Sequence, residues 1–366
     1  MRPRTARGRA GPRRENHHGG TVRPVPEPES DLVVAITGPT GTFGFGLAPL
    51  LQDDTRVARV VGIARRPFDP VDHGWTKMEY RRGDVRDPAS LERAFRGADV
   101  VVHLAFLITG TASRATIRAV NVEGTLNTVR AAAAAGARRF VFASSVAAYG
   151  FHADNPVGMD EEWPVRPAAR LFYAQEKAEL EGLLDEEVAR HAGLDLYMLR
   201  PSIVLGPHAV GGKDLRLGPL APLAGRLARH ASTLRIPLPA PVPRLPVQFV
   251  HEDDVGQALS LCVVGAGPAG AYNIAGDGVL TGTEVARELG LAPLPVPGRL
   301  VHGPARAVAA LGALPLVPPA TAWAEVLSHP AIMDTTKAKR ELGWRPRYTG
   351  LDALRDTLRR WRAGRA

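Results

Sequence analysis

The chain has very little cysteine, and this scarcity excludes several kinds of protein. Cys262 is the single cysteine among 366 residues, so a disulfide framework is excluded. It lies in the apolar run ALSLCVVGA, which predicts a buried thiol. The eleven histidines show neither the H-E-x-x-H pattern nor paired-cysteine spacing, and we therefore predict no metal site.

A long apolar run free of proline is also lacking. Residues 307–324 carry no charge, but Pro315, Pro318 and Pro319 interrupt them. Prolines remove helix hydrogen bonds that a bilayer cannot replace. We therefore expect no membrane span, and instead a buried or substrate-facing segment.

Positive charge is concentrated at the start of the chain. The formal net charge is +9, but residues 1–30 hold seven Arg and three Glu, which leaves +5 for the rest. Because the remainder is only mildly basic, no nucleic-acid partner is predicted. Residues 1–30 are poor in large apolar side chains and predict a disordered basic arm, with binding to phosphate or an acidic surface as the alternative. No apolar stretch of signal-peptide length follows the arginines, so we expect a cytoplasmic protein.

Short apolar runs alternate with helical stretches over the first two thirds of the chain. This pattern predicts an α/β fold, a Rossmann-type doubly wound parallel sheet with right-handed crossovers. After Pro207 the sequence becomes rich in Pro, Leu and Arg, and this change in composition predicts a smaller C-terminal α/β substrate lobe. We assign 31–207 to the nucleotide-binding domain, with contributions from 247–275, and 208–366 mainly to the substrate lobe. The apolar runs are LVVAITG (32–38), RVVGIA (59–64), VVVHLA (100–105), RFVFAS (139–144) and DLYMLR (195–200).

A glycine-rich turn, TGPTGTFG, follows the first of these runs. Gly38, Gly41 and Gly44 are spaced three apart, between a buried strand and a helix expected from about Phe43. Such glycines permit a tight turn and a close approach of a pyrophosphate to the unpaired N–H groups of the helix. The turn therefore predicts dinucleotide binding. Its predicted contacts also include Thr40, Thr42 and Phe43.

The end of the second run discriminates between nicotinamide cofactors. A carboxylate there would bind the ribose 2′-hydroxyl, whereas an arginine accommodates a 2′-phosphate. Ala64 stands where the acid is expected, and Arg65 and Arg66 follow it. NADP is therefore favoured, with NAD as the alternative.

The clearest chemical signal is the Y-x-x-x-K pair of Tyr173 and Lys177. Residues four apart share a helix face, so a phenol and an ammonium can point into one pocket. We expect the positive charge to lower the pKa of the phenol, which would then exchange protons near neutral pH. Ser145 lies 28 positions before the tyrosine, at the end of a predicted strand. Its neighbour Ser144 is expected to face the other side of that strand and to be structural.

These motifs occur in an order that resembles the extended short-chain dehydrogenase/reductases, the NAD-dependent epimerase/dehydratase group. The resemblance covers about 31–362 and implies a Rossmann domain with a C-terminal substrate lobe. Besides the glycine turn, Ser145 and YxxxK, it rests on GDVRD (83–87), VVHLA, NVEGT (121–125), RPSIVLGP (200–207), FVHEDDV (249–255) and TTKAKRELGWRPR (335–347).

The resemblance implies a role for each matching residue. Tyr173 would donate or accept the proton, and Lys177 would lower its pKa and hold the nicotinamide ribose. Ser145 would hydrogen-bond the reacting oxygen, with support from Asn121. The remaining implied cofactor contacts are Asp84 and Val85 beside the adenine, Leu104 and Ala105 beneath the cofactor, and Pro201.

Departures from the family pattern narrow the activity. Val146 and Ala147 follow Ser145 where sugar-nucleotide dehydratases carry acids, which argues against elimination chemistry. Ile203 stands where many sugar-nucleotide enzymes carry a diphosphate-binding asparagine, so an apolar ketone or alcohol is a suitable small-molecule substrate. A diphosphate is still an alternative ligand because of the arginines at 216, 226, 229 and 235.

Three classes of function therefore stay open. The leading hypothesis is an NAD(P)-dependent oxidoreductase that interconverts an alcohol and a ketone. The second is a redox-neutral nucleotide-sugar epimerase with retained NAD, and the third is a non-catalytic nucleotide-sensing protein. Relatives are commonly dimeric, so a homodimer is expected.

Overall fold

A seven-stranded sheet forms the centre of the protein. The computed structural model describes residues 30–108, 112–209, 237–297, 300, 303–304 and 329–363. The strand order is β12-β7-β5-β4-β1-β2-β3, and all neighbouring pairs are parallel. This confirms the predicted Rossmann-type sheet. The strands are β1 (Leu32–Thr37), β2 (Val57–Ala64), β3 (Met78–Arg82), β4 (Val100–His103), β5 (Arg139–Ala143), β7 (Asp195–Pro201) and β12 (Gly270–Ile274).

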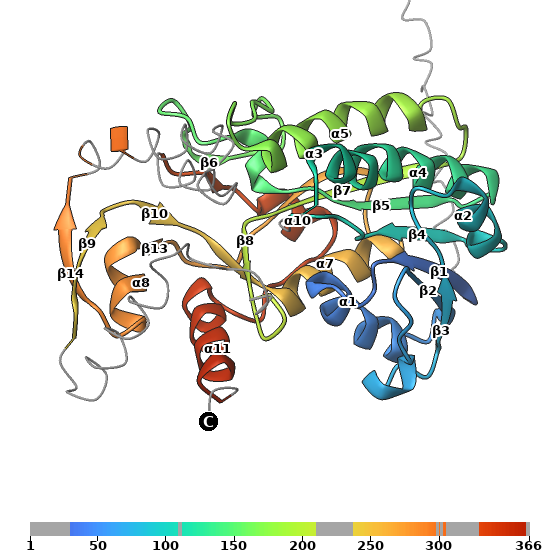
Figure 1. Ribbon diagram of the computed structural model, residues 1–366, viewed down its shortest axis with the longest axis horizontal. Coiled ribbons are helices and arrows are strands. Elements are labelled where there is room, and N and C mark those ends of the chain that lie inside the picture. Colours follow the sequence, from blue (N-terminus) through green and yellow to red (C-terminus); the bar gives the residue numbers. More distant parts are fainter. Residues whose placement is uncertain are drawn as a thin grey trace, which may run out of the picture.

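Helices cover both faces of the sheet (Figure 1). Helices α1 (Thr42–Asp53) and α7 (Glu252–Val263) pack on one face against residues such as Val34 and Ile36. The other face carries α2 (Pro88–Phe95), α4 (Gly124–Ala134) and α5 (Phe172–Val188), which pack against Ala35 and other residues. Val34, Ala35 and Ile36 are all buried, which explains why this strand is a continuous apolar run rather than an alternating one.

The order in which strands are added to the sheet reverses at β1, and this switch positions the candidate site. β1 pairs with β2 on one side and with β4 on the other, so the crossovers diverge at its carboxyl end. In doubly wound sheets such a switch point leaves a crevice where ligands bind. The glycine turn lies directly after β1, as the sequence predicts.

The remaining described elements form small two-stranded sheets and further helices. The pairs are β8 (Ile203–Leu205) with β11 (Phe249–His251), β9 (Pro239–Pro243) with β14 (Ala292–Val296), β10 (Pro246–Val247) with β13 (Leu280–Thr281), and β6 (Val157–Met159) with β15 (Ile332–Met333). Further helices among the described residues are η1 (Pro70–His73), α3 (Arg114–Arg118), η2 (Ala119–Glu123), η3 (Val146–Tyr149), α8 (Gly282–Glu288), α10 (Thr336–Glu341) and α11 (Gly350–Ala363).

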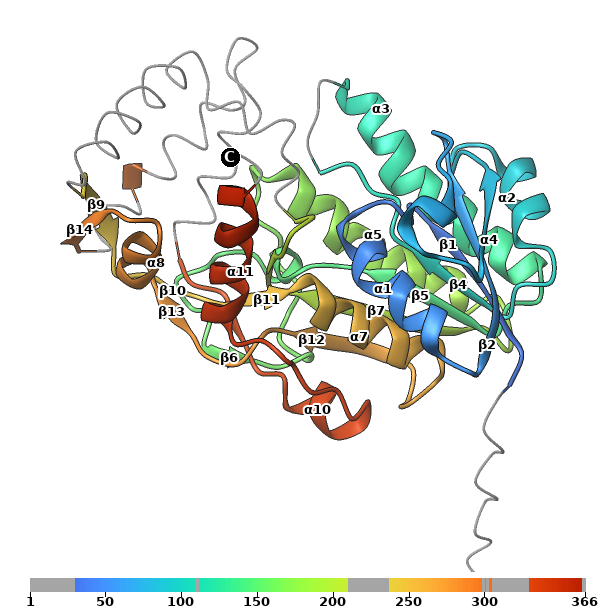
Figure 2. The same cartoon turned by 90° about the horizontal axis from the view of Figure 1, so that it is seen from below.

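The later elements divide between two regions. α8, β9 and β14 lie at the end of the molecule far from β3, whereas α7 lies beside α1 (Figures 1 and 2). β12 forms the edge of the central sheet. This arrangement suits a nucleotide-binding domain that takes in 247–275, and the division into 31–207 and 208–366 stays a proposal.

Several expectations fall outside the described residues. They concern most of the basic arm, the apolar segment 307–324 and the arginines at 216, 226, 229 and 235. Within the described residues, no helix combines the length and the apolar character needed to cross a membrane. Cys262 is fully buried, which confirms that prediction.

Candidate active site

The glycine turn brings the start of α1 close to the central sheet. Gly38 has φ 71°, and a Cβ on it would lie 3.0 Å from the backbone of Ala105. A Cβ on Gly44 would overlap the carbonyl oxygen of Pro39. The N-cap residue Gly41 provides no side-chain hydrogen bond to the helix. The first turn of α1 can therefore offer its N–H groups to a phosphate.

Arginines gather where β2 and β3 end. Arg65 and Arg66, the residues expected to bind a 2′-phosphate, are exposed directly after β2. Arg82 ends β3 in register with Ala64, a neighbour that the sequence alone did not reveal. Arg86 donates two hydrogen bonds to Asp84 and holds the pKa of that carboxyl low, with a further contribution from Arg65. This edge is therefore strongly positive around one paired carboxylate.

A cavity of about 420 Å³ opens from the glycine turn toward the end of β5. Its lining contains eight of the predicted residues: Gly41, Thr42, Phe43, Leu104, Ser145, Tyr173, Lys177 and Pro201. Its other lining residues are His103, Phe106, Ile108, Ala143, Val146, Ala147, Phe151, Ser202, Ile203, Val204 and Ala209. The predicted residues outside this lining are Gly38, Thr40, Gly44, Arg65, Arg66, Asp84, Val85, Ala105 and Asn121.

Ser145 and Tyr173 meet inside this cavity. Ser145 is the N-cap of η3, and its hydroxyl accepts a hydrogen bond from the N–H of Ala147 at 3.1 Å. A hydrogen bond also joins the Ser145 and Tyr173 side chains. Burial raises the pKa of Tyr173. The hydrogen bond to Ser145 lowers this pKa, but by less than burial raises it. The direction is opposite to the one that the Y-x-x-x-K spacing predicts.

Lys177 explains this difference. The side chain is buried, and its ammonium donates a hydrogen bond to the carbonyl of Ala143 and lies 3.5 Å from the ring centroid of Phe106. It is farther from the ring centroid of Tyr173, at 5.9 Å. Burial lowers the pKa of Lys177 to about 7, although Glu181 and Glu176 oppose this shift. The lysine therefore titrates near neutral pH in a site lined by aromatic rings.

Asn121 lies behind the cavity, within the π-helix η2. Its amide donates to the carbonyl of Leu107 at 2.9 Å and to the carboxylate of Glu176 at 2.7 Å, and it accepts from the N–H of Leu107 at 2.7 Å. A π-helix turn re-aims side chains and is frequent at functional sites. Asn121 thus fixes the segment after β4 beside Lys177.

His103 is a buried polar group at the cavity that the predicted site residues left out. Thr125 donates its hydroxyl hydrogen to the carbonyl of Asn121, so it must accept from the Nε2–H of His103, 2.9 Å away. The Nδ1 of His103 then accepts from the hydroxyl of Thr37 at 2.8 Å. Burial lowers the pKa of His103 to about 3, with a contribution from Lys177. The ring is therefore neutral and fixed in one tautomer.

Ser144 differs from the expected alternation along a strand. β5 ends at Ala143, so the side chains of Ser144 and Ser145 both reach α5. The Ser144 hydroxyl donates to the buried carboxylate of Glu181 at 2.5 Å. Its structural role agrees with the expectation, whereas its direction does not.

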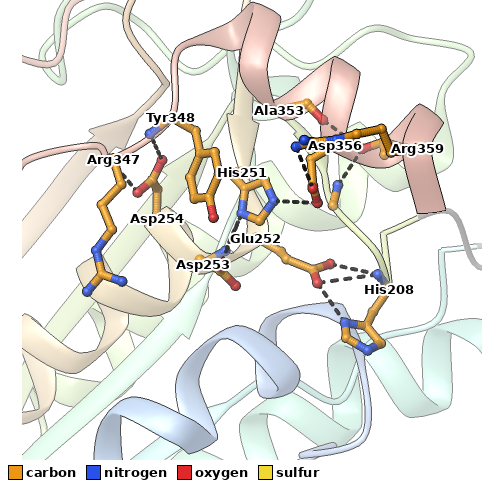
Figure 3. A network of polar contacts seen from close by, with 12 residues as sticks. His208, His251, Glu252, Asp253, Asp254, Arg347, Tyr348, Ala353, Asp356 and Arg359 are labelled. Atoms are coloured by element: carbon orange, nitrogen blue, oxygen red, sulfur yellow. Dashed lines mark hydrogen bonds and ion pairs between the residues drawn. The ribbon is translucent and has the colours of Figure 1, made fainter.

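A second polar network lies at the amino end of α7 (Figure 3). The buried carboxylate of Glu252 contacts the Nδ1 of His208 at 2.6 Å and accepts from its backbone N–H. The carbonyl of His208 accepts from Thr42 at 3.0 Å, and its ring stacks on Phe45 with a centroid distance of 4.0 Å. The loop after β8 is therefore attached to the start of α1.

The same network attaches the C-terminal segment. The carboxylate of Asp254 accepts from the N–H groups of Arg347 and Tyr348, at 2.7 and 3.1 Å. His251 accepts from the N–H of Asp253 through Nδ1, so its Nε2–H faces Asp356 on α11, 3.4 Å away. These contacts hold α7 and α11 together beside the site.

Sequence reasoning missed several of the lining residues. His103 could have been found, because it belongs to the VVHLA motif and precedes Leu104. Phe106 and Ser202 carried no signal, since their place depends on how the loops after β4 and β7 turn into the cavity.

Comparisons with known proteins agree with this geometry. The NAD dependent epimerase/dehydratase family matches residues 34–275. The chain is 28% identical over 346 residues to the uncharacterized protein Rv0501 of Mycobacterium tuberculosis, covering 91% of this chain and 85% of that protein. It is 30% identical over 324 residues to a ceramide reductase of Caulobacter vibrioides, covering 86% of each.

Solved structures share the fold. A dTDP-glucose 4,6-dehydratase of Streptomyces venezuelae with NAD bound superposes with a TM-score of 0.66 at 24% identity, covering 91% of this chain and 98% of that chain. A UDP-glucose 4-epimerase of Thermotoga maritima with UDP-glucose gives a TM-score of 0.67 at 20% identity, covering 92% and 100%.

Proposed function

Because the chain belongs to the NAD dependent epimerase/dehydratase family, we propose that it is an oxidoreductase that interconverts an alcohol and a ketone. The observation that carries this proposal is the meeting of Ser145, Tyr173 and Lys177 in the cavity that begins at the glycine turn. The uncapped first turn of α1 fits the pyrophosphate of a dinucleotide, and the cavity beyond it fits a nicotinamide ring with a substrate.

Each residue around the cavity has a separate role in the proposed reaction. A nicotinamide cofactor, when bound, would supply the hydride for the carbonyl carbon or accept one from the alcohol carbon. In the direction of reduction, Tyr173 donates its hydroxyl proton to the ketone oxygen, and Ser145 hydrogen-bonds the same oxygen. The phenolate that is left then takes up a proton before the next turnover, and Lys177 lines the same cavity four residues along the helix. In the direction of oxidation the same proton returns to Tyr173.

The cavity wall favours an apolar substrate. Phe106, Ile108, Phe151 and Val146 line the cavity, and Ile203 stands where a nucleotide-sugar enzyme of this family would carry asparagine. An isoleucine side chain has no donor for a diphosphate. Similarity to a ceramide reductase supports a ketone with large apolar substituents.

The arginine edge favours NADP over NAD. Arg65, Arg66 and Arg82 would surround the 2′-phosphate of an adenosine ribose at the ends of β2 and β3. We expect Arg65→Ala to weaken NADPH binding about tenfold and NADH binding less than twofold, measured by fluorescence titration. Equal losses for the two cofactors would remove the preference for NADP.

A redox-neutral nucleotide-sugar epimerase is the second candidate, because the family of the chain is named for epimerases and dehydratases. The two candidates differ in the fate of the cofactor. A reductase consumes added NADPH, whereas an epimerase turns over with its own tightly held NAD. Mass spectrometry of nucleotides released from freshly purified full-length protein, combined with turnover assays with and without NADPH, separates them. Retained NAD and isomerised sugar without NADPH consumption would overturn the first proposal.

A further inference from the structure

Ser202 is a buried hydroxyl that the proposed reaction does not use. It lies between β7 and β8, and its backbone N–H donates to the carbonyl of Ile274 at 2.8 Å. The residue is 5% exposed, and its Oγ has no hydrogen-bond partner among the described residues. A buried hydroxyl without a hydrogen-bond partner destabilises the folded protein, so we expect a ligand to supply that partner.

The position of Ser202 indicates what that ligand is. Ser202 lines the main cavity together with Ser145, Tyr173 and Lys177. It also lines a smaller cavity of about 30 Å³ whose wall includes Leu245, Pro246, Val247 and Pro330. The two cavities share Val146, Phe151, Ser202 and Ile203. Ser202 is therefore the one polar residue of the wall that the two cavities share, and the other three residues of that wall are apolar.

The other polar side chains that line the smaller cavity, Gln248 and His329, both have interactions. Gln248 donates to the carbonyl of Met333 at 3.0 Å and accepts from its N–H at 2.8 Å. This double contact holds Gln248 on β15, whereas the hydroxyl of Ser202 keeps its hydrogen-bonding capacity. The three serines therefore differ in their contacts: Ser144 contacts Glu181, Ser145 contacts Tyr173, and Ser202 belongs to the wall that the two cavities share.

We propose that Ser202 is a second substrate contact, whose hydroxyl donates a hydrogen bond to an acceptor oxygen near the reacting ketone of a substrate with an apolar remainder. This inference rests on the proposed function and narrows its substrate to ketones with an amide, hydroxyl or ether oxygen close to the carbonyl. The apolar remainder would lie against Phe151 and Ile203, toward the smaller cavity.

The test compares two ketones of equal chain length, one with an amide oxygen near the carbonyl and one with a plain alkyl chain. We expect Ser202→Ala to lower kcat/KM for the amide ketone about tenfold, mainly through KM, and to change the alkyl ketone less than twofold. Ser202→Thr should restore most of the loss, because it keeps the hydroxyl. Ser260→Ala is the matched control, because it makes the same chemical change on α7.

Stability and binding separate this proposal from a structural role and from the proposed function itself. Ser202→Ala should not lower the thermal unfolding midpoint, since the hydroxyl has no partner to lose. Calorimetry of the amide ketone with the NADP-bound full-length protein should show about tenfold weaker binding to Ser202→Ala, whether or not turnover occurs. Equal binding to both proteins, no binding to wild type, or equal losses for both ketones would overturn the Ser202 proposal. Tight binding without NADPH consumption would instead refute the reductase.

Discussion

Two clusters built from the same kinds of side chain lie side by side along α5, and one is open while the other is closed. Tyr173, Lys177 and Glu181 follow one another at four-residue spacing on this helix. Tyr173 and Lys177 face the cavity with Ser145. Glu181 instead belongs to a buried cluster with Ser144 and two further residues, Arg200 and Tyr149.

The two clusters differ in that one of them contains the carboxylate of Glu181. It accepts from Ser144 and binds Arg200 through two nitrogens, and Arg200 also donates to the hydroxyl of Tyr149 at 2.7 Å. Burial would lower the pKa of Arg200, but the hydrogen bond and charge of Glu181 outweigh it and raise that pKa. Lys177 is left with the neutral carbonyl of Ala143, which is why burial dominates its pKa. A serine, a tyrosine and a cation are thus held in a closed hydrogen-bonded network where a buried carboxylate is present, and the same three kinds of side chain line a cavity where it is absent, which is where we propose the reaction.

The largest expected contrast is between the two tyrosines. Tyr173→Phe should lower kcat about 10³-fold, because no other group of the cluster is placed to supply its proton, while NADPH affinity stays nearly unchanged. Tyr149→Phe should keep turnover within about threefold and lower the free energy of unfolding by about 1–3 kcal/mol, because Arg200 and Asn273 lose a buried partner. Steady-state kinetics and urea unfolding of both variants check this. If Tyr173→Phe lost cofactor affinity and activity together, the residue would be structural.

The adjacent serines give the next contrast. Ser145→Ala should lower kcat about 10²-fold with little change in stability, because it removes a donor to the reacting oxygen. Ser144→Ala should leave kcat within about threefold and lower the free energy of unfolding by about 1–3 kcal/mol, because Glu181 loses a donor. The same two assays apply, and a reversal of the two phenotypes would show that the open and closed clusters have been misassigned.

The smallest effect concerns Lys177 and the pH dependence of the free energy of unfolding. The pKa of Lys177 is lowered in the folded state to about 7, below its unfolded value of about 10.4, so the unfolded chain binds more protons between these values. The unfavourable contribution of Lys177 is therefore complete below pH 7 and is relieved as the pH rises, by at most about 1.4 kcal/mol per pH unit. Lys177→Met should remove this rise, which urea unfolding at pH 6, 8 and 9 can measure. Parallel pH profiles of variant and wild type would contradict the lowered pKa.

Features set by local spacing could be predicted from the sequence. The apolar run 32–38, the spacing of Gly38, Gly41 and Gly44, and the Tyr173–Lys177 pair depend on neighbours along the chain, and the sheet confirms the fold that they imply. Eight predicted residues line one cavity.

Features set by distant contacts could not be predicted. The direction of the Tyr173 pKa depends on burial, which outweighs the hydrogen bond to Ser145. The place of Ser202 depends on the approach of β7 to segments near residues 245 and 330. These residues are far apart in the sequence, so no periodic sequence pattern indicates that they lie close together in the fold.

The most direct test of the proposed reaction is isotope transfer from NADPH deuterated at the transferable C4 position to an apolar ketone, measured by mass spectrometry of the alcohol formed. We predict an alcohol one mass unit heavier, formed one for one with NADPH consumed by the wild-type protein and not by Tyr173→Phe. An alcohol without deuterium, or transfer that is unchanged in Tyr173→Phe, would contradict the account.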